Sequence, residues 1–252
     1  MLFQDPAEIG KEFLFINITI GTINLALDII IVFYVINQLY IKKESREKKL
    51  EKKQYINLTT WGLFFLLITI ANIILLIRAL NELNNPLPSE TYNVIEKTAI
   101  LLIYSAFFTK ILYLEYTLND LKLYKGYYFS IAFSIVMIFI FLLDLESIKE
   151  PGVLQYIFLA LLVFGYSIIP ILYLYLAIKT VGQSRKDSFK VCVGSIMFAL
   201  GSMAGPANLY GYYGFYDIID LLIRYSMITG PLCVILATII IFDSFRSKKE
   251  NT

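Results

Sequence analysis

The sequence predicts an all-α integral membrane protein, a bundle of seven transmembrane helices, and three observations lead to this prediction. Hydrophobic residues make up 58% of the 252 residues, and the mean hydropathy of +0.68 exceeds what a soluble domain of this size requires. Charged residues are only 17% of the chain and fall mostly in short intervals. The apolar runs between those intervals are each long enough to cross the roughly 30 Å hydrocarbon core of a bilayer.

Seven such runs, taken in order, define the predicted helices of one domain covering residues 1–252. The predicted spans are about 14–41, 57–80, 94–117, 127–145, 152–178, 188–208 and 217–243. The fourth run is the shortest, and glycines interrupt the sixth more than the others. The chain starts without the basic stretch of a cleavable signal peptide, so we expect the first helix to remain as a spanning segment.

The interval KKESREKKLEKK at residues 42–53 separates the first two runs and indicates the orientation of the bundle. It holds three acidic residues and seven basic ones, which are Lys42, Lys43, Arg46, Lys48, Lys49, Lys52 and Lys53. Sixteen Lys and Arg fall on this side, in that interval, at Lys122 and Lys125, at Lys179, Arg185, Lys186 and Lys190, and at Arg246, Lys248 and Lys249. Only Lys11 and Lys149 fall on the other side. Because basic loops stay in the cytoplasm, we predict a multi-pass cell-membrane protein with an extracellular N-terminus and a cytoplasmic C-terminus.

Several classes of function are disfavoured by the residues that the chain lacks. It contains no histidine, which removes the usual general base, the commonest metal ligand and the usual pH switch. No acid/base pair with a nucleophile can be assembled, so we expect neither an enzyme nor a metal site. The two cysteines, Cys192 and Cys233, lie inside apolar runs and are interpreted as small buried hydrophobes. We expect the lipid bilayer, and not nucleic acid, as the surrounding partner.

Ionisable residues inside apolar runs are the best candidates for function, because they are costly in a membrane. In the first predicted helix, Asn24 and Asp28 share a face, and Asp28 lies close to mid-depth. In the third predicted helix, Glu96 and Lys110 share a face, with Lys110 slightly to the inner side. The depths of Asp28 and Lys110 would allow them to pair if their helices touch.

A second group of charged residues is predicted near the outer ends of three helices. Asp217, Asp220 and Arg224 lie on one face of the seventh predicted helix, and Arg78 and Glu96 lie at a similar depth on the second and third. Together they would suit a zwitterionic or small polar ligand. The alternative is that some of them reach the interface as long side chains do, while the others form structural ion pairs.

Prolines inside the last three predicted helices are candidate hinges. Pro170, Pro206 and Pro231 each remove a backbone hydrogen bond and favour a kink. Prolines are also common in transmembrane helices without any motion, so tight packing and static kinks remain the alternative.

The predicted plan resembles that of seven-helix receptors. Seven helices, an outside N-terminus and prolines in the fifth to seventh helices are similar to rhodopsins, G-protein-coupled receptors and the seven-helix sensor regions of prokaryotic histidine kinases. The likeness is one of architecture. The seventh predicted helix has no lysine to hold retinal, so we expect no such cofactor, and LEYTLND at the end of the third lacks the receptor D/E-R-Y element. The Ile-, Lys- and Asn-rich composition suits the prokaryotic sensors best.

These observations favour a receptor-like membrane sensor that binds a small ligand in an outward-facing cavity. Because the sequence contains no kinase domain, we expect it to signal through a separate cytoplasmic partner. Residues 42–53 would dock that partner or anionic lipid headgroups. The alternatives are a small transporter or channel lined by Asp28, Lys110 and Arg224, and an accessory membrane subunit without a ligand.

Overall fold

The computed structural model of the chain describes residues 11–44, 52–84, 89–142, 153–203 and 220–245, and every regular element in these ranges is a helix. The helices are α1 (Lys11–Glu44), α2 (Lys52–Asn84), α3 (Ser89–Asp120), α4 (Tyr128–Leu142), α6 (Val153–Lys179), α7 (Gly182–Met203) and α9 (Asp220–Phe245). Each of the seven predicted runs overlaps one of them, so the prediction of an all-α chain with seven helices is confirmed for the described residues. Helix α7 begins earlier than predicted, because the polar stretch after Gly182 is already helical.

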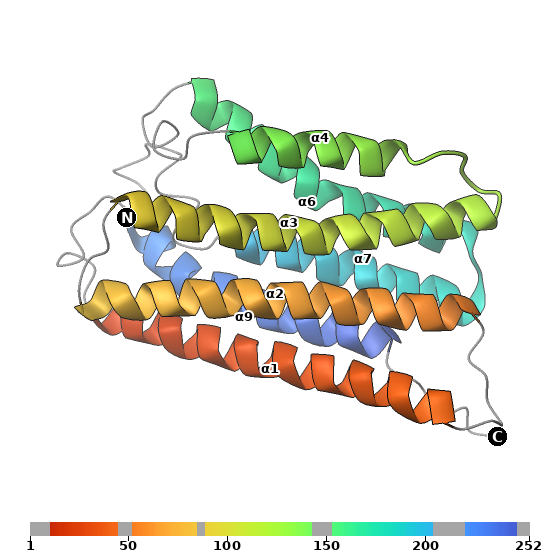
Figure 1. The fold of residues 1–252 in the computed structure, drawn as a ribbon, viewed down its shortest axis with the longest axis horizontal. Coiled ribbons are helices and arrows are strands. Elements are labelled where there is room, and N and C mark those ends of the chain that lie inside the picture. Colours follow the sequence, from red (N-terminus) through yellow and green to blue (C-terminus); the bar gives the residue numbers. More distant parts are fainter. Residues whose placement is uncertain (1–10, 45–51, 85–88, 143–152, 204–219, 246–252) are drawn as a thin grey trace.

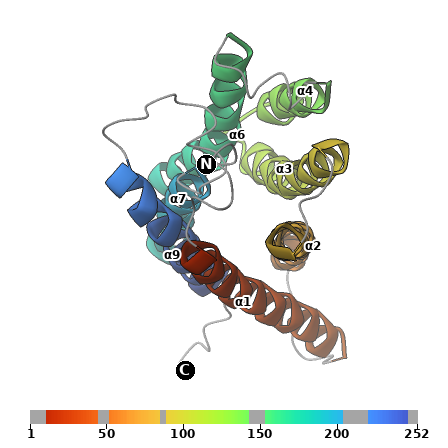
Figure 2. The ribbon, with the colours of Figure 1, turned by 90° about the vertical axis from the view of Figure 1, so that its left-hand side faces the viewer.

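The helices run roughly along one common axis and form a ring in chain order (Figure 1, Figure 2). Each helix packs against the next one along the chain, and α1 packs against α9 to close the ring. Helix α3 also contacts α6, so α4 lies on the outside of that pair. Side chains fill the space between the helices.

Three of the described helices contain a stretch that is long and apolar enough to cross a membrane. These stretches are Ile18–Tyr40 in α1, Tyr55–Arg78 in α2 and Lys97–Asp120 in α3. Shorter apolar stretches occupy Tyr128–Leu142, Val163–Lys179 and Thr229–Phe245, and the described part of α7 contains neither kind. The finding indicates a membrane protein, while the seven spans and their orientation remain predictions.

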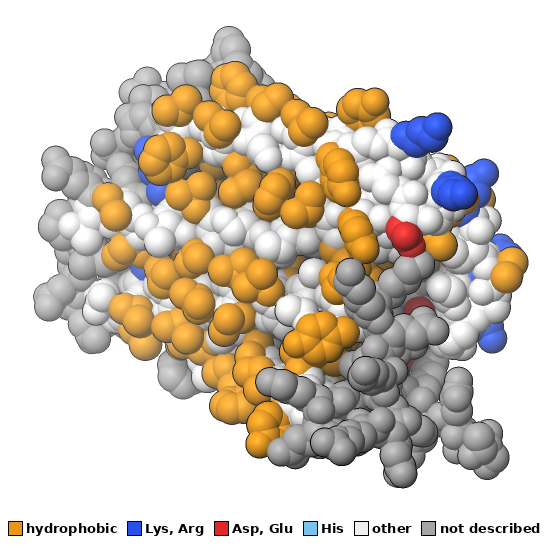
Figure 3. Space-filling view, turned by 45° about the vertical axis from the view of Figure 1, so that its right-hand side comes forward, with side chains coloured by type: hydrophobic (Ala, Val, Ile, Leu, Met, Phe, Trp, Pro, Cys, Tyr) orange, Lys and Arg blue, Asp and Glu red, His pale blue; other side chains and the backbone are white. Residues whose placement is uncertain are grey.

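Large apolar side chains cover much of the outside of the bundle. Phe33 on α1 is 68% exposed and Ile138 on α4 is 59% exposed, which is costly for both residues in water. Figure 3 shows hydrophobic side chains along the length of the helices and Lys and Arg side chains gathered mostly at one end. A soluble monomer rarely exposes so continuous an apolar surface.

Helices α7 and α9 approach each other closely through glycines. A Cβ added to Gly201 would lie 2.6 Å from the carbonyl oxygen of Gly230 and 2.9 Å from a methyl group of Val234. Such distances leave no space for a side chain. The glycine therefore sets the separation of the two helices.

We expect the substitution Gly201→Ala to destabilise the protein by about 1–3 kcal/mol, because the added methyl group forces α7 and α9 apart. Thermal unfolding of the protein in lipid nanodiscs measures the change. Gly21→Ala is the matched control, since nothing lies within 4 Å of a Cβ at Gly21, and it should be neutral or mildly stabilising. Equal midpoints for the two variants would contradict the close approach.

Candidate functional site

The side chain of Lys110 is fully buried in the interior of the bundle. It extends from α3 toward α2, where its Nζ donates hydrogen bonds to Asn57 Oδ1 at 3.2 Å and to Thr60 Oγ1 at 3.4 Å. Asn57, Thr60 and Trp61 follow one another at helical spacing, so one face of α2 presents all three to Lys110. The partners of this ammonium group are therefore neutral.

Two aromatic rings complete the surroundings of the Lys110 ammonium. Nζ lies 3.7 Å from the centroid of the Trp61 ring and 4.7 Å from that of Tyr113. A desolvated cation–π contact of this kind stabilises the charge by about 2 kcal/mol. No carboxylate among the described residues lies within ion-pair distance of Lys110, so a positive charge on this group would have no counter-ion there.

The Trp61 ring connects Lys110 to two further helices. It stacks on Phe245 of α9 with a centroid separation of 5.1 Å and an interplanar angle of 16°. It also stacks on Tyr173 of α6 at 6.5 Å and 21°. We call Trp61, Lys110, Tyr173 and Phe245 the Trp61 cluster; it joins α2, α3, α6 and α9 at one point in the core.

Two of the predicted hinge prolines belong to helices of the Trp61 cluster. Pro170 is buried inside α6, one turn before Tyr173, and Pro231 lies inside α9. Pro206 lies outside the described residues. Whether either proline acts as a hinge stays a prediction, but a change of direction at Pro170 would move Tyr173 against Trp61.

Asp28 and Asn24 form a second buried polar site, between α1 and α2. Asp28 is 1% exposed and Asn24 is 8% exposed. Asn72 of α2 donates a hydrogen bond from Nδ2 to Asp28 Oδ2 at 2.9 Å. The Oδ1 atoms of Asp28 and Asn24 have no hydrogen-bond partner among the residues that the structure describes.

Asp28 and Lys110 do not form the pair that their depths allowed. Both are bonded to α2, but Asp28 binds Asn72 and Lys110 binds Asn57, and these positions are about 22 Å apart along a helix axis. The structure therefore separates the buried carboxyl group of Asp28 from the buried amino group of Lys110. The position of a residue along its own helix did not predict which residues of the next helix lie beside it.

The predicted outer group is described only in part. Arg78 is buried at the end of the α2 span, and its side chain has an interaction partner. Glu96 lies in α3, and Asp220 and Arg224 lie in α9, but their side chains are outside the described residues, as is all of Asp217. The basic side chains of residues 42–53 are likewise outside the described residues.

Glu115 of α3, whose buried side chain reaches the first turn of α4, was not identified from the sequence. Its Oε1 accepts a hydrogen bond from the Phe129 N–H at 2.8 Å, and its Oε2 accepts from the N–H of Ser130 at 2.9 Å and from the Ser130 hydroxyl. The N-terminus of α4 is the positive end of its helix dipole, and it stabilises the negative charge of the Glu115 carboxylate. Asn119, one turn later on α3, bonds both backbone groups of Gly126. Glu115 lies within the third predicted span and could have been found by the criterion that identified Asp28.

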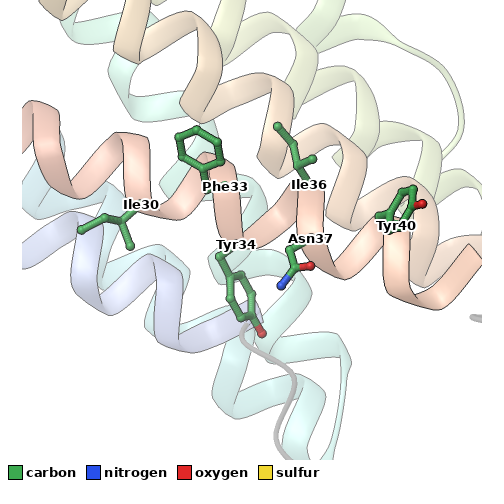
Figure 4. Close-up of a pocket in the computed structure, with 6 residues that line it drawn as sticks. All are labelled: Ile30, Phe33, Tyr34, Ile36, Asn37 and Tyr40. Carbon is green, nitrogen blue, oxygen red and sulfur yellow. The ribbon is translucent and has the colours of Figure 1, made fainter.

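An open groove of about 560 Å³ lies along α1. It is lined by Ile30, Phe33, Tyr34, Ile36, Asn37 and Tyr40, all from this helix, and Figure 4 shows Tyr34 and Asn37 on the same side. Tyr34 makes an edge contact with Phe242 of α9. The groove does not reach Lys110 or Asp28, so neither buried site opens into it.

No protein-family model, curated protein or solved structure matches the chain. Among the described residues, no group of three or more Cys, Asp or Glu side chains could hold a metal ion. The two buried sites are therefore interpreted from their own geometry.

We expect Lys110→Met to raise the thermal unfolding midpoint. Burying an unpaired charge costs several kcal/mol, which exceeds the cation–π contribution of about 2 kcal/mol, while Met keeps an apolar side chain of similar length. Lys190→Met is the control, because Lys190 forms an ion pair with Asp243 and its loss should leave the midpoint equal or lower. A lower midpoint for Lys110→Met would mean that Lys110 serves only stability.

Proposed function

We propose that the protein is a receptor-like sensor of the cell membrane with seven spanning helices, an extracellular N-terminus and a cytoplasmic C-terminus. In this proposal a small polar ligand binds among the outer ends of the helices, and the helices transmit the event to a cytoplasmic partner. The single observation that carries it is the Trp61 cluster, where the ring that contacts the buried Lys110 amino group also stacks on side chains of α6 and α9.

The membrane part of the proposal is supported by the surface of the bundle. Three helices are long and apolar enough to cross, and the remaining helices are packed against them in one ring. The turns from α3 to α4 and from α6 to α7 lie at the same end of the bundle (Figure 1), and the first of them carries Lys122 and Lys125. Basic residues in such turns are expected for a cytoplasmic face.

In this proposal, the effect of ligand binding is transmitted through the contacts of the buried Lys110 side chain. Since Lys110 has no counter-ion, its position depends on weak contacts with neutral groups and on the Trp61 ring. A ligand that changes the angle of α6 or α9 would shift Tyr173 or Phe245 against that ring and disturb the contact. A ligand shifts the equilibrium between two conformations by the difference in its affinity for them. Because the contacts of Lys110 are weak, we expect a small difference in affinity to be enough.

A small transporter or channel is the second candidate, and Asp28 is the observation that favours it. A buried carboxylate with one unpartnered oxygen is common on ion pathways through membranes. The role of an accessory subunit, with residues 42–53 binding a partner or anionic lipid, has no comparable observation among the described residues.

Thiol labelling should test the seven spans. In a background with Cys192→Ala and Cys233→Ala, we expect a membrane-impermeant thiol reagent to label Asn85→Cys and Lys149→Cys on intact cells. Lys125→Cys should be labelled only after permeabilisation. Labelling of Asn85→Cys alone would indicate three spans, and labelling of Lys125→Cys on intact cells would reverse the orientation.

Fluorescence of Trp61, the only tryptophan in the chain, should test the sensor. With the protein in liposomes and free amino acids as zwitterionic probes, we expect a probe that raises the thermal unfolding midpoint to change the Trp61 emission. Lys110→Met should keep the binding and lose the emission change, because the ring no longer contacts a cation. Trp61→Phe supplies the blank.

Two results would contradict the sensor. Uptake of the radiolabelled probe into the liposomes would indicate transport. Binding without any change in Trp61 emission would show that ligand binding does not affect the Trp61 cluster.

A further inference from the structure

Two buried oxygen atoms on one face of α1 lack a hydrogen-bond donor in the described part of the chain. Asn24 Oδ1 and Asp28 Oδ1 are both unpartnered, and their residues are one helical turn apart, with Cβ atoms about 5–6 Å apart. Leaving a buried acceptor without a partner destabilises the folded state. Two acceptors cannot bond each other unless a hydrogen lies between them.

One proton on Asp28 would turn one of the two unpartnered oxygens into a donor for the other. Protonated Oδ1 becomes a donor and can bond Asn24 Oδ1, while Oδ2 continues to accept the hydrogen bond from Asn72. The same proton removes the negative charge from a position that is 1% exposed. An ionised carboxylate there would be buried without a counter-ion.

No described side chain of the neighbouring helices supplies that counter-ion. The charged and titratable side chains that the structure describes on these helices are Tyr34 and Tyr40 on α1, Tyr55 and Arg78 on α2, and Cys233 and Asp243 on α9. Arg78, the cation nearest to Asn72 in the sequence of α2, is about 9 Å farther along the axis. Asp243 is engaged with Lys190.

The geometry suits a proton better than a metal ion. Calcium takes about six to eight oxygen ligands, and magnesium needs a near-octahedral set, whereas this site offers two unpartnered oxygens. A proton needs only one oxygen that binds it covalently and a second oxygen that accepts its hydrogen bond.

We propose that Asn24, Asp28 and Asn72 form a proton-binding site between α1 and α2, in which Asp28 is neutral and donates a hydrogen bond to Asn24. Water supplies the proton, an O–H bond forms on Oδ1, and release returns the proton to water without any redox step. The proposal rests on the packing of α1 against α2 and not on the sensor function.

Infrared spectroscopy of the whole protein in lipid nanodiscs, recorded from mildly acidic to mildly alkaline pH without added ligand, tests the site. The wild type should show the carbonyl stretch of a neutral carboxylic acid at neutral pH, and Asp28→Asn should lose it. Asp243→Asn is the matched control and should retain it. Asp28→Asn should fold, because its amide can donate to Asn24 and accept from Asn72 as the neutral acid does.

Thermal unfolding gives a second readout with a defined sign. If only the folded state holds the proton at neutral pH, it binds more protons than the unfolded state, so stability falls as the pH rises. The wild type should show this fall, and Asp28→Asn should show less of it.

Two results would overturn the proton site. One is a wild-type spectrum without a neutral carboxylic acid band, or a band that survives Asp28→Asn. The other is stabilisation of the wild type, but not of Asp28→Asn, when sodium replaces choline, which would assign the site to an alkali cation. Because no ligand is added, neither result bears on the sensor proposal.

Discussion

The contact between the Lys110 ammonium and the Trp61 ring is the interaction around which the core is arranged. A cation in an apolar interior needs partners that provide negative potential, and here a ring face, an amide oxygen and a hydroxyl oxygen provide it. Tyr173 and Phe245 stack on the same ring. The position of Lys110 is therefore coupled to helices α6 and α9, which it does not bond.

Buried ionisable groups in this bundle follow two different patterns. Glu115 is satisfied by three donors at the first turn of α4, so it fixes the connection between α3 and α4. Within the described ranges, Lys110 and Asp28 have no opposite charge beside them, and Asp28 has no donor for one oxygen. Satisfied groups contribute to the fold, whereas incompletely satisfied ones are the places where a ligand, a proton or a movement would change the energy most.

The two incompletely satisfied sites share one helix. Helix α2 supplies Asn72 to Asp28 and the Asn57–Trp61 face to Lys110. A tilt or rotation of α2 would thus alter both sites together, although they are far apart. The proposed proton site and the proposed role of the Trp61 cluster rest on different observations. Helix α2 nevertheless connects them and gives a physical route for coupling.

The sequence by itself determined the number, type and approximate position of the helices, because apolar runs and charged intervals depend only on the order of residues. It also identified Asp28 and Lys110 as exceptional, since ionisable residues in apolar runs are costly whatever the packing. Only the tertiary structure decided their partners. Residues far apart in the chain, such as Trp61 and Phe245, are brought together by how the helices pack, and no spacing in the sequence records it. The same holds for Glu115, whose role depends on where α4 begins beside it.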